Sequence, residues 1–515
     1  MCYSMILSST VSDFTGEEVL SQCLTIGPYL LGLGLGSLFG EKETNERALN
    51  KLINIEWASS IILPLLPLLF ILTVFFFINS HSSINLINSK RELIFYLGVA
   101  CILSLITGLL GGSQLPLIFK LFGEKSSSEI VIGLNYLGPL FSGPLIVLLN
   151  NLAFETPKQL GIIVIIQVLG IVILGFRLKN KSSLLIKLTL PLILVINFQN
   201  IHVNIEYLTL KSIYLGTKIN FNNLDNVKTG LNFLYQYGKL ERVKTPYQVI
   251  DYFTTQKHPE IELEEESTLF LNRKTQFSDA AISPYHESMV YAGLNLFKGN
   301  AKNFLILGGG DGLLLKEIKQ ANPKAKITLV ELDQQMIDWA RKNPKLSKQN
   351  HFSLDLNKGD TNIIIDDAIS YLRKFNSRKK FDIVLIDLPF PDGYELTKLY
   401  SIEFYTLLKE TIYNDSIVII DLPLQKEESG DISKDSKIIL KTLEMVGFDN
   451  KLPFGPTLSF IALTLSQKKL AFDYTNFPNY LKLSTKQNLR KHITDKEMSS
   501  SLKSVIPNSM FRPNL

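Results

Sequence analysis

Cysteine is scarce in this chain. Its 515 residues include three cysteines, Cys2, Cys23 and Cys101, and all of them lie in the apolar first part of the sequence. This distribution argues against a disulfide framework and against a cysteine-based metal site. No other cluster of metal-ligand side chains stands out, so we expect chemistry that needs no metal ion.

The sequence also lacks a basic stripe and a recognisable signal peptide. The net charge of +5 is spread over many loops, and aromatic residues are not interleaved with lysines and arginines. Nucleic-acid binding therefore has little support. The first eleven residues have neither a basic n-region nor a small-residue cleavage site, so we expect no cleavable secretory signal.

Long apolar runs dominate the sequence before about residue 206. A helix needs about 20 mostly apolar residues to cross the hydrocarbon core of a bilayer. Six runs approach that length: Leu24–Phe39, Trp57–Phe77, Leu93–Phe119, Ile130–Leu152, Gly161–Phe176 and Leu184–Phe198. We expect an N-terminal multi-span α-helical membrane domain over residues 1–206, with a buried helical core in a soluble protein as the alternative. The small residues of Gly32–Ser37 predict a close approach between two helices.

The pattern changes at about residue 207. Four short runs, Ile213–Tyr214, Leu231–Tyr237, Gln248–Phe253 and Thr268–Leu271, predict a small β-rich domain over residues 207–292. Strand-like and helix-like segments then alternate. Strands are predicted at Asn303–Leu307, Ile327–Glu331, Asn362–Ile365, Ile383–Ile386 and Ile417–Ile420, and helices at Leu313–Gln320, Gln334–Lys342 and Ala368–Phe375. This rhythm predicts a C-terminal α/β Rossmann-like doubly wound domain over residues 293–515.

A glycine-rich turn follows the first of these strands, in the sequence LILGGGDG (Leu305 to Gly312). Glycines such as Gly308 and Gly310 allow a sharp turn and a close approach to a ligand. Glu331 ends the next strand, where a carboxylate can accept hydrogen bonds from ribose hydroxyls. Asp311 would repel a pyrophosphate and attract a cationic sulfonium nucleoside. The structural alternative is a turn that only packs a helix on the sheet.

Two more carboxylates, Asp366 and Asp367, follow the third strand. Either could receive a hydrogen bond from an adenine amino group. Each could instead serve as a helix N-cap or as a stabilising acid in the first helical turn.

Several motifs together resemble one family. LILGGGDGLLLKEI (Leu305 to Ile318) and ITLVELDQQMIDWAR (Ile327 to Arg341) resemble the nucleoside loop and the ribose-binding strand and helix of spermidine synthases. TPYQ (Thr245 to Gln248), Gln276 and YHE (Tyr285 to Glu287) resemble the substrate-gate segments of that family. NYLGPLFSG (Asn135 to Gly143) resembles its membrane-fused members. The resemblance to spermidine synthases covers roughly residues 240 to 465. Compared with the membrane-fused members, the chain is expected to begin inside the first membrane span.

The resemblance implies a polyamine aminopropyltransferase. Such an enzyme transfers an aminopropyl group from decarboxylated S-adenosylmethionine, a co-substrate, to putrescine or a related amine and releases methylthioadenosine. The implied donor contacts are Gln248, Gln276, His286, Gly308, Gly310, Asp311, Glu331, Asp366, Asp367, Ala368 and Pro391. The implied catalytic residues are Tyr285, Asp387 and Asp392, with Tyr285 and Gln276 lining the gate between donor and amine. Tyr285 and His286 could instead be ordinary packing residues. The resemblance also implies a homodimer.

The amine half of the pattern departs from the family. In IDLPFPDG (Ile386 to Gly393), Phe390 occupies the position of the family's proton-accepting Asp. Asp392 lies two residues further on and is the expected substitute, unless it is only a turn residue. Ala281 and Ile282 align with an Asp-Glu pair of the family. Asp421 occupies a position where the family usually has an uncharged polar residue, so it is expected to return one negative charge to the pocket.

Two further readings stay open. One is an S-adenosylmethionine-dependent methyltransferase, and the other is a non-catalytic membrane sensor of adenosyl nucleosides or polyamines. We expect a multi-pass protein of the cell membrane whose soluble domain is cytoplasmic, because its nucleoside substrate is cytoplasmic. The loop charges disagree: loops near 41–56, 120–129 and 177–183 carry eight Lys and Arg, against three in loops near 78–92 and 155–160.

Overall fold

The computed structural model divides the chain into two compact units, Met1–Ser278 and Asp279–Leu515. The described residues are 1–16, 18–38, 45–80, 90–122, 128–152, 154–176, 184–257, 265–279, 282–355, 360–376, 378–391, 394–422, 432–455, 459–474, 481, 483–490, 502, 505–511 and 513–514.

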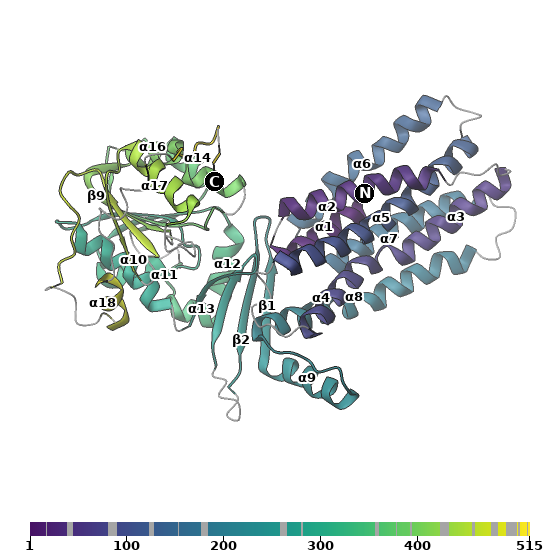
Figure 1. Ribbon diagram of the computed structural model, residues 1–515, viewed down its shortest axis with the longest axis horizontal. Coiled ribbons are helices and arrows are strands. Elements are labelled where there is room, and N and C mark those ends of the chain that lie inside the picture. The colour runs from purple at the N-terminus through teal and green to yellow at the C-terminus, as the bar shows by residue number, and fades with distance from the viewer. Residues whose placement is uncertain are drawn as a thin grey trace. The chain divides into compact units, whose positions relative to one another are not determined.

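The first unit is a bundle of helices followed by a small sheet, as Figure 1 shows. Its helices are α1 (Cys2–Thr15), α2 (Glu18–Ser37), α3 (Asn45–Ile62), α4 (Leu65–Ser80), α5 (Lys90–Phe122), α6 (Ser128–Asn151), α7 (Thr156–Gly175), α8 (Leu184–Leu215) and α9 (Leu224–Tyr237). Its strands are β1 (Gly238–Lys244), β2 (Val249–Thr255), β3 (Ser267–Leu271) and β4 (Lys274–Ser278). The four strands form an antiparallel sheet in the order β1-β2-β3-β4.

Five helical stretches of the described residues are long and apolar enough to cross a bilayer. They are Glu18–Ser37, Arg47–Asn79, Glu92–Leu121, Thr156–Gly175 and Leu184–Leu215. The sequence predicted an apolar helix in each of these places. The predicted run Ile130–Leu152 falls largely in α6, of which Leu140–Asn151 is a shorter apolar stretch. Phe39, the end of the first predicted run, lies outside the described residues.

Glycines make the tightest helix crossing of the bundle, between α2 and α5. A Cβ atom on Gly32 would lie 2.4 Å from the carbonyl oxygen of Leu105, and one on Gly108 would lie 2.1 Å from that of Tyr29. Gly36 meets α5 one turn further on. The two backbones can therefore touch only because these positions carry no side chain. This crossing confirms the prediction made from Gly32–Ser37.

Two β-like runs of the sequence are helical, so those predictions were wrong. Ile213–Tyr214 lies in the last turns of α8, and Leu231–Tyr237 lies in α9. The Asn223 side chain caps α9 by accepting a hydrogen bond from the Asn226 N–H, and the helix buries Leu234. The apolar spacing of this segment, with positions three and four residues apart, fits a helical face better than a pleated strand. Helix α1 was not predicted at all, although it buries Ile6, Leu7, Val11 and Phe14.

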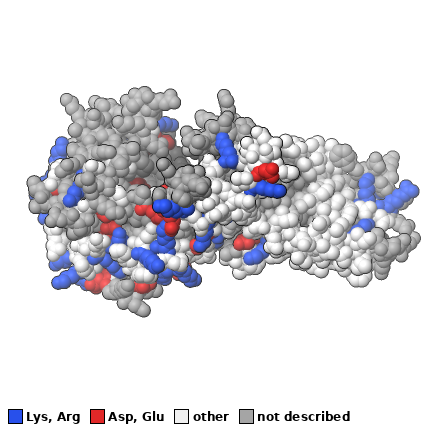
Figure 2. All heavy atoms as spheres, turned by 90° about the horizontal axis from the view of Figure 1, so that it is seen from below, with Lys and Arg blue, Asp and Glu red and all other residues white. Residues whose placement is uncertain are grey.

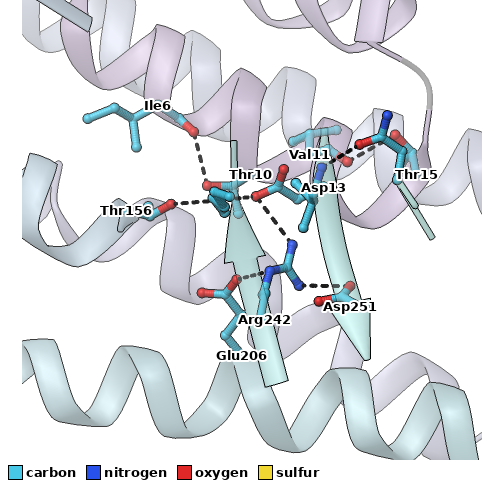
Figure 3. Close-up of polar contacts among 12 residues, drawn as sticks. Ile6, Thr10, Val11, Asp13, Thr15, Thr156, Glu206, Arg242 and Asp251 are labelled. Atoms are coloured by element: carbon cyan, nitrogen blue, oxygen red, sulfur yellow. Dashed lines mark hydrogen bonds and ion pairs between the residues drawn. The ribbon is translucent and has the colours of Figure 1, made fainter. Parts of the chain in front are cut away.

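A buried cluster of charges joins the sheet to the bundle (Figure 3). The Arg242 guanidinium on β1 is only 4% exposed and lies 3.7 Å from Asp13, 3.7 Å from Glu206 and 3.6 Å from Asp251. Lys244 also pairs with Asp13. Burial alone would lower the pKa of Arg242, but the three carboxylates outweigh burial and raise it. The cluster brings together α1, α8, β1 and β2, and each of its acids has a basic partner.

The second unit is an α/β domain built on a seven-stranded sheet. Its strands are β5 (Asn303–Gly308), β6 (Lys326–Glu331), β7 (Thr361–Ile365), β8 (Phe381–Asp387), β9 (Ile412–Asp421), β10 (Asn450–Phe454) and β11 (Phe460–Thr464). Its helices are α10 (Ile282–Leu296), α11 (Leu313–Ala321), α12 (Gln334–Lys342), α13 (Pro344–Gln349), α14 (Ala368–Lys374), α15 (Tyr394–Thr397), η2 (Lys398–Tyr400), α16 (Ile402–Glu410), α17 (Lys434–Val446) and α18 (Leu483–Arg490).

The sheet has the doubly wound order β10-β11-β9-β8-β5-β6-β7. The pairs β5–β6, β6–β7, β5–β8 and β8–β9 are parallel, whereas β11 runs antiparallel to both β9 and β10. Helices α14, α16 and α17 lie on one side of the sheet, and α10 and α11 lie on the other (Figure 1). The predicted Rossmann-like fold is confirmed, with strands and helices at the expected segments. The strand order reverses between β5 and β8, which is where such folds bind ligands.

Candidate active site

The glycine-rich turn lies where β5 gives way to α11. Gly308 has φ 84°. A Cβ atom there would come within 2.0 Å of the Asp387 carbonyl oxygen, at the end of β8. A Cβ atom on Gly310 would come within 2.8 Å of the Glu331 Oε2 atom, at the end of β6. Glycine is therefore required at position 308, whereas a Cβ atom at position 310 would displace the Glu331 carboxylate. The turn lies against the carboxyl ends of both neighbouring strands.

Asp311 is buried inside this turn, with 8% of its surface exposed. Its Oδ1 atom accepts a hydrogen bond of 2.8 Å from the Leu313 N–H, while its Oδ2 atom lies 3.9 Å from Nε2 of His286. Burial raises the pKa of Asp311 to about 6, although the Leu313 hydrogen bond opposes the rise. One oxygen thus holds the start of α11, and the other is directed toward His286 on α10.

Glu331 ends β6, next to the turn. Its Oε1 atom accepts a hydrogen bond of 2.9 Å from the Asp333 N–H. Burial raises the pKa of Glu331 to about 7, with a smaller contribution from the charge of Asp333 and an opposing one from this hydrogen bond. Two hydroxyl donors from a ribose would stabilise the ionised form and lower this pKa. The predicted ribose contact is consistent with this position and stays a prediction.

Asp366 and Asp367 follow β7. Asp367 caps α14 by accepting a hydrogen bond of 3.0 Å from the Ser370 N–H, and Ala368 begins that helix. Asp366 pairs with Lys374 at 2.9 Å, and its pKa is lowered chiefly by this hydrogen bond. Asp367 thus makes the N-cap contact that was weighed against an adenine contact, whereas Asp366 precedes the cap and pairs with Lys374. The role of both acids in binding stays a prediction.

A second group of polar side chains gathers at the ends of β8 and β9. The Tyr285 hydroxyl on α10 donates a hydrogen bond of 3.1 Å to Oδ1 of Asp387. Burial raises the pKa of Asp387 to about 6, and the charge of Asp311 adds to the rise while His286 and Tyr285 oppose it. Burial also raises the pKa of Asp421 to about 7, followed by the charge of Asp387. The sequence predicted that Asp421 returns one negative charge to the pocket, but it did not give this residue a catalytic or binding role.

The segment after β8 is only partly described. Phe390 is partly buried and packs against the hydrophobic core between the sheet and the helices, and Pro391 is buried. Asp392, the predicted substitute for the missing acid, lies outside the described residues, as do Gly393 and Ala281. Its catalytic role stays a prediction.

Gln248 and Gln276 lie in the first unit. The Gln248 carbonyl, just before β2, accepts a hydrogen bond of 2.9 Å from the Thr245 N–H. The Gln276 side chain on β4 is exposed and donates a hydrogen bond of 3.2 Å to the Lys274 carbonyl. Their predicted donor contacts depend on their motifs alone. Within the described residues, no three His, Cys, Asp or Glu side chains meet as a metal-binding group.

A doubly wound sheet with a glycine-rich turn and a strand-end glutamate at the point where the strand order reverses is typical of α/β domains that bind nucleotides. Comparison with known proteins narrows this class. Residues 282–448 match the family model described as spermine/spermidine synthase domain. Residues 282–448 therefore form a domain of the spermine/spermidine synthase family, and the curated relatives of the chain are polyamine aminopropyltransferases.

Curated relatives extend the match beyond this domain. Polyamine aminopropyltransferase 1 of Streptomyces coelicolor is 28% identical over 455 residues, covering 87% of this chain and 77% of the relative. The polyamine aminopropyltransferase of Leptospira interrogans is 28% identical over 424 residues, covering 82% and 76%. Among solved structures, spermidine synthase from Thermotoga maritima is 22% identical, with a TM-score of 0.39, and covers 51% of this chain and 88% of its own.

Proposed function

We propose that this chain transfers an aminopropyl group from decarboxylated S-adenosylmethionine to putrescine or a related amine and releases methylthioadenosine. The observation that carries the proposal is the acidic edge formed by Asp311, Asp387 and Asp421 beside the glycine-rich turn. Among the described residues, none of these carboxylates pairs with a lysine or arginine. A sulfonium donor and an ammonium acceptor are both cations, so both are attracted to this edge.

The reaction is a displacement at the carbon next to the sulfonium. The attacking amine must be neutral and in line with the breaking carbon–sulfur bond, so the site has to hold both substrates and accept one proton. Glu331 and the glycine-rich turn are positioned to hold the nucleoside. Asp387, with Tyr285, lies on the next strand and would orient the reacting groups. The contacts of Gln248, Gln276, His286, Asp366, Asp367, Ala368 and Pro391 with the donor remain part of the proposal.

The test is an assay on the full-length chain purified in detergent. Methylthioadenosine release would be measured with decarboxylated S-adenosylmethionine and putrescine, and compared with release from S-adenosylmethionine. We expect release with the decarboxylated donor only, and only when amine is present. Methyl transfer from S-adenosylmethionine would establish a methyltransferase instead. Nucleoside binding without turnover of any amine would establish a sensor.

We further propose that the helices of the first unit span a lipid bilayer. The outer faces of α2, α5, α7 and α8 expose large apolar side chains, among them Leu31, Ile102, Ile173 and Ile196. Figure 2 shows the helical part as a long surface almost free of charged residues, with Lys and Arg gathered toward one end. An apolar surface of this extent is costly in water and favourable in lipid. Extraction of the chain only by detergent, and not by high salt or alkali, is the expected result.

The sidedness of the soluble part and the assembly of the chain also stay proposals. A cytoplasmic location fits the nucleoside substrate, whereas the charges of loops 41–56, 120–129 and 177–183 favour the other side. Labelling of a single cysteine introduced at an exposed residue of the second unit, in intact cells, decides between them. The division into residues 1–206, 207–292 and 293–515, and the homodimer implied by the family, are retained on sequence grounds.

A further inference from the structure

Asp421 and Asp387 end two neighbouring parallel strands in the same register. Ile386 pairs with Ile420, so each acid is the next residue of its strand. Neighbouring strands lie about 4.8 Å apart, and residues at matched positions point to the same face of the sheet. The two carboxylates therefore lie side by side at the carboxyl edge of the sheet. Asp421 lies one strand further from the glycine-rich turn than Asp387 does.

The Tyr285 hydroxyl serves both carboxylates. It donates a hydrogen bond of 3.1 Å to Asp387, and it is also within hydrogen-bonding reach of Asp421. Its ring packs on Phe460 with 5.1 Å between ring centres, which fixes the hydroxyl in place. A phenol carries a single proton, so it can satisfy only one of the two acids at a time. Among the described residues, Tyr285 is thus shared between two acids that each need a hydrogen-bond donor.

The charges around Asp421 show the same deficit. The groups that influence its titration are Asp387 on β8 and Tyr285 on α10. Asp387 in turn is influenced by Asp311 in the glycine-rich turn and by His286 on α10. Three carboxylates thus share one imidazole and one phenol, and within the described residues they form no ion pair with a lysine or arginine. A ligand that brings positive charge and several N–H donors would complete the group.

We propose that Asp421 anchors the attacking ammonium of the acceptor amine and takes its proton. The inference rests on the proposed function and specifies its acceptor site. Asp387 already accepts the Tyr285 hydrogen bond, and its Oδ2 atom would lie 3.6 Å from a Cβ atom on Gly309 of the glycine-rich turn. Asp421 ends the next strand, on the side away from the turn. A carboxylate whose pKa lies near the working pH is also the better proton acceptor, and that of Asp421 is raised to about 7.

The Asp421 carboxylate takes one proton from the ammonium and leaves a neutral amine. The nitrogen lone pair forms the new bond to the aminopropyl carbon, while the electrons of the breaking carbon–sulfur bond go to sulfur. Methylthioadenosine leaves as a neutral thioether, and the positive charge moves to the alkylated nitrogen. The proton on Asp421 is then released to water.

The test compares Asp421→Asn with Asp415→Asn in the full-length chain in detergent. Asp415 lies on the same strand, β9, but is exposed, so its variant controls for a charge change on that strand. In D421N, methylthioadenosine release with putrescine should fall about 100-fold or more. The ionisation near neutral pH should also disappear from the pH profile of kcat/KM for the amine. The affinity of D421N for methylthioadenosine should stay within about threefold of the wild-type affinity, because the nucleoside-binding residues are unchanged.

Amine binding gives a second readout that does not need turnover. Titration of putrescine into the chain loaded with methylthioadenosine, in buffers of different ionisation enthalpy, reports both affinity and proton exchange. We expect D421N to bind putrescine at least about tenfold more weakly, since a charged hydrogen bond is lost. The proton exchange linked to binding should disappear, while D415N behaves as wild type.

The outcomes separate this inference from the function on which it rests. If the wild-type chain turns over putrescine and D421N keeps the wild-type rate and pH profile, the role of Asp421 is overturned and the proposed function stands. If the wild-type chain is inactive but binds putrescine more tightly than D421N does, the proposed function is overturned, whereas the role of Asp421 in binding the ammonium stands. If it neither turns over nor binds an amine, both are overturned.

Discussion

Both units of the molecule remove carboxylates from water, but they do so in opposite ways. In the first unit, Asp13, Glu206 and Asp251 surround Arg242, and Lys244 adds a second positive charge. In the second unit, Asp311, Asp387 and Asp421 share no lysine or arginine among the described residues. In the first cluster each carboxylate therefore has a basic partner, whereas in the second, within the described residues, none has a lysine or arginine.

The difference indicates what each cluster is for. A buried ion pair holds its elements together only while both partners are present, and removing one partner leaves a costly unpaired charge. Carboxylates without a partner reduce the stability of the ligand-free fold, so their presence at a ligand-binding edge points to binding. The first cluster would then be structural, and the second would be the site at which cationic substrates bind.

The largest effect is expected for Arg242→Met. It leaves Glu206 and Asp251 buried without their cation and should cost about 3–5 kcal/mol of stability. Little folded chain should be recovered after detergent extraction, as measured by fluorescence-detected size exclusion. Lys239→Met, at an exposed position of the same strand β1, is the control and should behave as wild type. A stable R242M chain would mean that the first cluster is not structural.

The pH dependence of stability provides the next comparison. The pKa values of Asp387 and Asp421 rise from 3.8 to about 6 and about 7 on folding. The folded chain therefore binds more protons than the unfolded chain between about pH 4 and pH 7, so stability from these groups is lost as the pH rises. As the pH rises through that range, the melting temperature of the double variant D387N/D421N should increase relative to that of the wild type. A constant difference between the two would contradict the raised pKa values.

A smaller effect is expected for Tyr285→Phe. The variant removes the one hydroxyl that serves Asp387 and Asp421 and leaves the ring on Phe460. We expect kcat/KM for the amine to fall about 10- to 100-fold, the range for a hydrogen bond to a charged group. The melting temperature should hardly change. Tyr413→Phe, at an exposed tyrosine of β9, should leave both quantities unaltered.

The smallest effect concerns Asp366→Asn. Asp366 pairs with Lys374 on the surface, and exposed pairs contribute little to stability. The melting temperature should therefore stay the same. If Asp366 also contacts adenine, the KM for the nucleoside donor should rise about threefold to tenfold. An unchanged KM would leave Asp366 with its surface ion pair to Lys374 alone.

The sequence predicted the second unit better than the first. Runs such as Phe304–Leu307 and Ile417–Ile420 are buried on both faces of a parallel sheet, so they are continuously apolar and easy to recognise. The glycine-rich turn was identified because few residues other than glycine tolerate the left-handed backbone that Gly308 adopts. In the first unit, Leu231–Tyr237 was read as a strand, since a short apolar run does not distinguish the two periods.

The polar contacts of the site depend on tertiary structure and could not be predicted in the same way. Tyr285 and Asp387 are 102 residues apart in the sequence, and only the packing of α10 on the sheet brings them together. Asp421 was visible as an extra charge, but its place beside Asp387 follows from the register of β8 and β9. Arg242 and Asp13 are similarly distant in sequence, so nothing local marked that cluster.

The most direct test of the account is the melting temperature of Asp387→Asn in the ligand-free, full-length chain at about pH 8. If this carboxylate is kept for ligand binding at a cost to stability, its replacement should raise the melting temperature by about 2–4 °C, which corresponds to roughly 1 kcal/mol in a domain of this size. Methylthioadenosine should no longer be released. A fall in the melting temperature would show that Asp387 is a paired structural group like Asp251 and would contradict the account.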